Sequence, residues 1–130
     1  MYGNNGLNAY KNNSVNHVSK QQLLLMLLDG SVRFVKISRQ AMEDKDIKKC
    51  HENIVKTQNI FTELMITLDQ KAGEWAVQMY RLYDFIKEKL VEANIKKDIK
   101  ILDEIIPLIE EIRDIWNEAD KVSKGQMKNA

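Results

Sequence analysis

The chain has 130 residues, 44% hydrophobic and 30% charged, which is enough to form one globular domain with its own core. Its formal net charge of +1 excludes the strongly basic character of proteins that are drawn to nucleic acid or anionic lipid. A single cysteine excludes an internal disulfide, and five glycines with one proline favour a few long helices over many strands.

The first 18 residues, MYGNNGLNAYKNNSVNHV, are rich in Asn and Gly and have no helical periodicity. We expect them to form a mobile tail, although apolar side chains such as Leu7 and Tyr10 are not needed in a purely solvated one. The segment lacks the features of a signal peptide, and no stretch reaches the ~20 apolar residues of a membrane span. We therefore expect a cytoplasmic protein without direct membrane insertion.

The first helix is predicted to begin after Ser19, because Gln22 follows three residues later and completes a capping box. Its apolar pattern continues to about Met42. The polar stretch EDKD interrupts the pattern, and Asp46 can cap a second helix that runs from about Ile47 to Leu68.

A third helix is predicted from about Glu74 to Ala93, and Asp98 can cap a fourth that ends near Val122. Pro107 lies inside the fourth helix, where it either kinks or breaks it; we favour a kink because the apolar seam keeps its phase. Four helices with short links predict an all-α fold, an antiparallel up-down four-helix bundle. The bundle would span residues 19–122, with flexible tails at 1–18 and 123–130.

The sequence contains few residues in arrangements that catalysis requires. The chain has two histidines, His17 in the tail and His51 at the margin of the second helix's apolar stripe, and neither belongs to a Glu-x-x-His pair. Cys50 and His51 point ~100° apart on a helix and cannot easily share a metal. The glycines never cluster into a phosphate-binding loop. We expect no enzyme, no metal and no cofactor.

The first helix carries more apolar side chains than one core requires. It contains the run LLLMLLDG at 23–30, and its apolar residues span roughly 240° of a helical wheel. Two stripes account for most of them, whereas Leu25 and Met26 fall outside both, and Ile60 lies off the stripe of the second helix. Either the first helix is central and buried on most sides, or part of the surface is a groove for an amphipathic segment. The alternative is a structural or signalling module that uses these extra apolar side chains to form a homodimer.

Five segments of the chain are informative as an ordered set: LNAYKNNSV, VSKQQLLLMLLDGSVRFVK, ENIVKTQNIFTEL, LYDFIKEKLVEANIKKD and ILDEIIPLIEEIRDIW. In this order they resemble the flagellar secretion chaperones of the FliS family, although SKQQL stands where that family often has Ser-Pro.

The resemblance implies a cytoplasmic chaperone that binds the disordered C-terminal region of flagellin, prevents premature polymerisation and aids delivery to the flagellar type III export gate. An anti-sigma factor or a co-chaperone is a further candidate partner, and the oligomeric state stays open. The match implies that Tyr10 anchors the tail near the flagellin groove, with Leu7 beside it. It also implies that Asn53, Lys56 and Gln58 could offer hydrogen bonds to a bound backbone.

Overall fold

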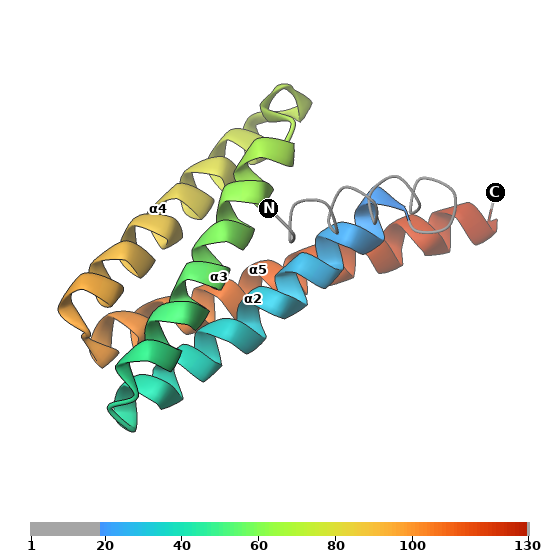
Figure 1. Ribbon diagram of the computed structural model, residues 1–130. Coiled ribbons are helices and arrows are strands. Elements are labelled where there is room, and N and C mark those ends of the chain that lie inside the picture. Colours follow the sequence, from blue (N-terminus) through green and yellow to red (C-terminus); the bar gives the residue numbers. More distant parts are fainter. Residues whose placement is uncertain (1–18, 130) are drawn as a thin grey trace, which may run out of the picture.

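The computed structural model describes residues 19–129, and the side chains of residues 19–125. The elements are α2 (Lys20–Glu43), α3 (Ile47–Thr67), the short 3-10 helix η1 (Gln70–Ala72), α4 (Glu74–Lys96) and α5 (Ile99–Asn129). Successive long helices run in opposite directions (Figure 1), so the all-α antiparallel bundle is confirmed.

The helices begin where the polar side chains of the sequence predict. The Ser19 hydroxyl accepts a hydrogen bond from the Gln22 amide at 3.1 Å, and the Gln22 side chain accepts one from the Ser19 amide at 3.3 Å. These two bonds complete the predicted capping box and satisfy two amides that the first turn leaves unpaired. Asp46 caps α3 through the amide of Lys49, at 3.2 Å.

The tripeptide Lys-Asp-Ile makes both turns at one end of the bundle, at 45–47 and at 97–99. Lys45 and Lys97 adopt left-handed backbone conformations, with φ of 61° and 51°, and so end α2 and α4. The aspartate that follows then caps the next helix; the Asp98 carboxylate accepts the amide of Lys100 at 3.0 Å. The same three residues therefore stop one helix and start another twice.

The C-terminal half of the chain is more helical than expected. Helix α4 continues past Ala93 to Lys96, and α5 continues past Val122 to Asn129. Pro107 lies inside α5, which is one unbroken helix, so the alternative of a helix break is wrong. Residues 123–129 are helical where a tail was expected, whereas the flexibility expected for 123–130 stays a prediction.

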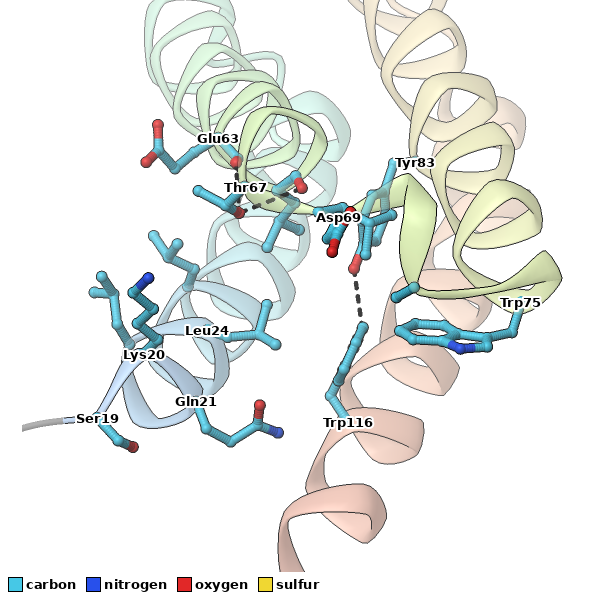
Figure 2. Close-up of a pocket in the computed structure, with 15 residues that line it drawn as sticks. Ser19, Lys20, Gln21, Leu24, Glu63, Thr67, Asp69, Trp75, Tyr83 and Trp116 are labelled. Carbon is cyan, nitrogen blue, oxygen red and sulfur yellow. Dashed lines mark hydrogen bonds between the residues drawn. The ribbon is translucent and has the colours of Figure 1, made fainter. Parts of the chain in front are cut away.

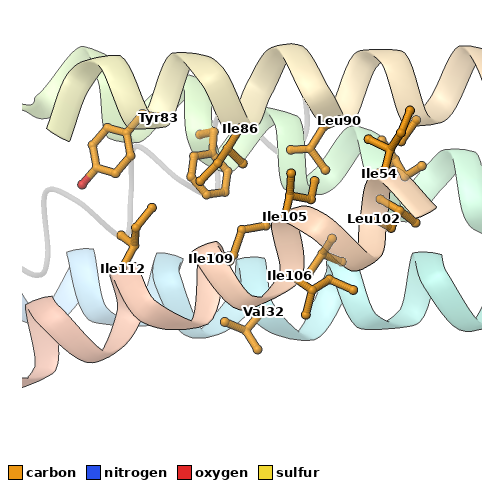
Figure 3. Packing of buried hydrophobic residues seen from close by; sticks show 14 of the residues in the cluster. Val32, Ile54, Tyr83, Ile86, Leu90, Leu102, Ile105, Ile106, Ile109 and Ile112 are labelled. Atoms are coloured by element: carbon orange, nitrogen blue, oxygen red, sulfur yellow. The ribbon is translucent and has the colours of Figure 1, made fainter. Parts of the chain in front are cut away.

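The core is a single apolar cluster to which all four long helices contribute (Figure 3). Its largest fully buried side chains are Tyr83, Phe61, Leu28, Ile54, Leu64, Ile86, Leu90, Leu102, Ile105, Ile109, Ile112 and Val35. Buried polar groups in this cluster find partners: the Ser31 hydroxyl donates to the Leu28 carbonyl at 2.7 Å, and Thr57 donates to the Asn53 carbonyl at 2.8 Å.

In Figure 1, α2 runs beside α5 and α3 runs beside α4, and these two pairs separate toward one end of the bundle. The most extensive contact between helices joins the pairs, between α2 and α3. The pairs meet at the end made by the two Lys-Asp-Ile turns, which we call the closed end. They diverge toward the other end, where η1 joins α3 to α4 and where α2 begins (Figure 1). We call this the open end.

Candidate functional site

A cleft of about 690 Å³ lies at the open end, between the start of α2 and the elements that diverge from it (Figure 2). Its volume falls in the range of roughly 300–1,000 Å³ that is typical of ligand pockets. The lining residues are Ser19, Lys20, Gln21, Leu23, Leu24 and Leu27 from the start of α2, Glu63, Leu64, Thr67 and Leu68 from the end of α3, and Asp69, Ala72, Trp75, Tyr83 and Trp116.

The apolar run LLLMLL at 23–28 forms one wall of this cleft. Leu23, Leu24 and Leu27 line it, and Leu28 is fully buried in the core beneath. The two residues that the helical wheel singled out behave differently: Leu25 is half-buried and Met26 is 55% exposed, and neither lines the cleft. The apolar side chains that border the cleft therefore lie on the core-facing side of α2, where the helix pairs diverge.

Aromatic side chains form the opposite wall. Tyr83 enters from α4 and Trp116 from α5, and the Trp116 indole N–H donates to the Tyr83 hydroxyl at 2.9 Å (Figure 2). Trp75 packs against Trp116 edge to face, with ring centroids 5.8 Å apart, and Phe61 packs in the same manner against Tyr83 at 5.9 Å. This series of rings joins α3, α4 and α5 at the point where the bundle opens.

The Tyr83 phenol is held in its neutral form. Burial raises the pKa of Tyr83 to about 12, and the hydrogen bond from Trp116 lowers this pKa by less than burial raises it. The residue is 1% exposed, and its ring is held by the contact with Phe61 and by the hydrogen bond from Trp116. The hydroxyl is consequently protonated at neutral pH and forms a polar group in a largely aromatic wall.

Polar side chains surround the apolar interior of the cleft. Ser19, Lys20 and Gln21 lie along the edge that α2 provides, and Glu63 and Asp69 lie along the edge that the end of α3 provides (Figure 2). An apolar interior with a few polar groups at its margin is the usual composition of a site that binds an amphipathic ligand.

The other residues singled out in the sequence lie away from the cleft. Asn53 is buried, and its side-chain amide donates to the Lys49 carbonyl at 2.8 Å, so that amide already has a partner within α3. Lys56 is exposed, and its ammonium group lies 5.2 Å from the centre of the Phe34 ring. Gln58 is half-buried and does not line the cleft.

Ile60 is half-buried and packs against the core between α2 and α3. A Cβ at Gly30 would come within 3.5 Å of its Cδ1, so Ile60 is a residue of the α2–α3 interface. Leu7 and Tyr10 lie outside the described residues. Neither Lys56 nor Ile60 lines the cleft, so a role for them in binding would require a second contact surface.

The described part of the chain provides no site for catalysis by a metal. No group of three or more His, Cys, Asp or Glu side chains could hold a metal ion among residues 19–125. His51 is exposed and forms a hydrogen bond with Asn94 at 2.9 Å, and Cys50 is fully buried, which raises the pKa of its thiol. Within residues 19–129, no helix has the length and apolar character to cross a membrane.

Comparison with known proteins gives a consistent result. Residues 3–123 match the model of the family described as flagellar protein FliS. The flagellar secretion chaperone FliS of Bacillus subtilis (strain 168) is 38% identical over 115 residues, which are 88% of this chain and 86% of that protein. The corresponding protein of Salmonella typhimurium is 32% identical over 124 residues, with 91% of this chain and 92% of that protein covered.

The fold is likewise similar to a solved one. The crystal structure of a flagellar chaperone from bacteria superposes on this chain with a TM-score of 0.72, covering 89% of this chain and 98% of the other. The two sequences are 15% identical, so this likeness concerns the arrangement of the helices.

Proposed function

This chain belongs to the FliS family of flagellar secretion chaperones, which are not enzymes, and we propose that its cleft binds the disordered C-terminal segment of flagellin. The observation that carries the proposal is the apolar interior at the open end, where leucines of α2 face the aromatic wall of α4 and α5. An amphipathic segment that folds as a helix can bury its apolar face between these two walls.

The cleft offers such a segment an apolar surface to pack against, which the segment lacks as a free chain. A client whose terminal regions are disordered must lose conformational entropy when it binds, so the contact must bury enough apolar surface to offset that loss. The lining leucines and the half-exposed Trp75 supply this surface, while the polar margin faces the polar side of a bound helix. By covering the client's apolar face, the chaperone would prevent premature polymerisation.

Calorimetric titration with a peptide of the flagellin C-terminal segment tests the proposal, together with an NMR measurement of whether the peptide becomes ordered. Leu23→Ser should weaken binding by about tenfold, because part of a leucine's contribution of roughly 1.5–3 kcal/mol is lost. Leu23 lines the cleft without belonging to the core cluster, so the fold should tolerate the change.

A matched control is available on α4. Ile95 is 78% exposed and lies near the closed end, so Ile95→Ser makes the same kind of change far from the cleft. It should leave the affinity unaltered. A wild-type chain that neither releases heat with the peptide nor orders it would contradict the proposal, and an obligate dimer unaffected by flagellin in sedimentation would favour the homodimer alternative.

The remaining roles follow from family membership and stay proposals. We place the chain in the bacterial cytoplasm, where flagellin is made, and expect it to aid delivery to the flagellar type III export gate. An anti-sigma factor or a co-chaperone remains a candidate second partner. Leu7 and Tyr10 remain candidate residues of the tail for contact with the groove, which Tyr10→Ala tests through the affinity for the flagellin peptide.

A further inference from the structure

The Tyr83 hydroxyl has one hydrogen bond of known direction. The Trp116 indole nitrogen can only donate, so the Tyr83 oxygen must be the acceptor in the 2.9 Å contact between them. The hydroxyl also carries a hydrogen of its own, which prefers the plane of the ring. Because Trp116 occupies one side of the oxygen, this hydrogen is directed to the other side. Among residues 19–125, no second partner accepts it.

A buried donor without an acceptor has a free-energy cost, of roughly 1–3 kcal/mol when it is also shielded from water. Tyr83 is 1% exposed as a residue, yet it lines the cleft, and Figure 2 shows its hydroxyl directed toward Trp116. An occupant of the cleft would approach this end of the side chain. The high pKa of Tyr83 keeps this hydrogen in place at neutral pH. The ring is fixed by Phe61 and Trp116, so little further ordering is needed when an acceptor arrives.

We propose that the Tyr83 hydroxyl is a binding subsite that donates a hydrogen bond to a main-chain carbonyl oxygen of the bound segment. This deepens the proposed function and rests on it. The last four carbonyls of a helix have no partner within that helix, so a client helix that ends beside Tyr83 presents a free acceptor. The bond would satisfy both groups at once.

The surroundings favour a neutral acceptor over a charged one. Figure 2 shows Asp69 and Trp116 near Tyr83, whereas the cationic side chain that lines the cleft, Lys20, belongs to its edge on α2. An unpaired carboxylate buried against this wall would lose its hydration without a counter-ion, which is more costly than burial of a carbonyl.

A single fixed donor would also set the position of the client along the cleft. Apolar contacts between a helix and a groove are similar after a shift of three or four residues, because the apolar stripe repeats at that spacing. A hydrogen bond to one carbonyl near the end of the client helix is satisfied in one position only. The subsite would therefore determine where the bound helix ends.

The variant Tyr83→Phe tests the subsite because it removes the hydroxyl and retains the ring. Its affinity for the flagellin C-terminal peptide should fall about three- to tenfold, the range expected for one hydrogen bond. Tyr80→Phe is the matched control, because Tyr80 is on the same helix but lines a separate depression with Thr62, Met65 and Lys87. It should bind as the wild type does. Circular dichroism establishes that both variants are folded.

A second measurement separates a direct bond from an indirect effect through Trp116. Peptides in which one amide at a time is replaced by an ester present a weaker carbonyl acceptor at a known position. At one position, the ester should weaken binding to the wild type but not to Tyr83→Phe. Equal losses in both proteins at every position, or unchanged affinity of Tyr83→Phe, would overturn the subsite. If the wild type binds no peptide at all, the proposed function itself fails.

Discussion

Trp75 and Trp116 meet edge to face at the cleft, with ring centroids 5.8 Å apart and ring planes inclined by 70°. They are the two tryptophans of the chain, and both line the proposed binding site. Trp75 is 50% exposed, so its emission reports the polarity of the cleft.

Binding of the flagellin peptide should accordingly shift the tryptophan emission to shorter wavelength, because the client replaces water around Trp75. A fluorescence titration checks this, and the midpoint should agree with the calorimetric affinity. Trp75→Phe should remove most of the shift. Heat of binding without any change in emission would show that the client binds elsewhere.

Gly30→Ala should stabilise the bundle by about 0.5–1 kcal/mol, since glycine within a helix is less favourable than alanine by that amount. Gly30 is buried in α2, and an added Cβ would lie 3.5 Å from Ile60 and 3.7 Å from Phe34, which are ordinary contact distances. Denaturant unfolding measures the gain. A loss of stability would mean that α2 and α3 are packed too closely to admit the methyl group.

Lys45→Gly should also raise the free energy of unfolding, by about 0.5–1 kcal/mol. Lys45 has a φ of 61°, a conformation that costs a residue with a Cβ roughly 1 kcal/mol and costs glycine almost nothing. Lys45→Ala removes the same charge and retains the Cβ, so it should bring no such gain. Thermal unfolding of the two variants side by side distinguishes the backbone effect from the loss of charge.

The ion pair between Arg39 of α2 and Asp103 of α5 should make stability depend on pH. The Arg39 side chain donates a hydrogen bond to Asp103, which holds the pKa of that carboxyl below its ordinary value. The pair therefore stabilises the fold fully above the ordinary aspartate pKa of about 3.9, and its contribution is lost as the pH falls through the lower folded-state pKa.

Asp103→Asn should lower the melting temperature slightly at pH 7, because the pair is partly exposed to solvent, and the difference from the wild type should disappear in strong acid. Glu104→Gln removes one negative charge from the neighbouring position, for which the structured region shows no ion pair. Melting temperatures of both variants across the acid range test the assignment. Equal shifts in the melting temperatures of the two variants would mean that the shift arises from net charge and not from the ion pair.

The features that the sequence predicts well are those set by neighbours along the chain. The capping box at Ser19 and the cap at Asp46 depend on side chains three residues away, so they could be read directly. The repeated tripeptide Lys-Asp-Ile was visible in the same way and was missed as a pair of helix-reversing turns. The fold class followed from helix length and apolar periodicity.

The cleft could not be read in this manner, because it depends on the angle between two helix pairs. A helical wheel treats a helix as having the same neighbours along its whole length. It therefore marked only Leu25 and Met26 of the first helix as lying outside the two apolar stripes, whereas Leu23, Leu24 and Leu27 are the residues of this run that line the cleft.

The position of the two Lys-Asp-Ile turns has a mechanical consequence. Both turns are at the closed end, so a small rotation of the pair α2–α5 relative to the pair α3–α4 would pivot near them. Displacement grows with distance from a pivot, and the cleft lies at the end of both helix pairs that is farthest from these turns. Its width can thus change the most while the isoleucines and leucines packed near the turns move the least. A rotation of this kind would let the cleft admit segments of differing bulk while the core near the turns stays in place.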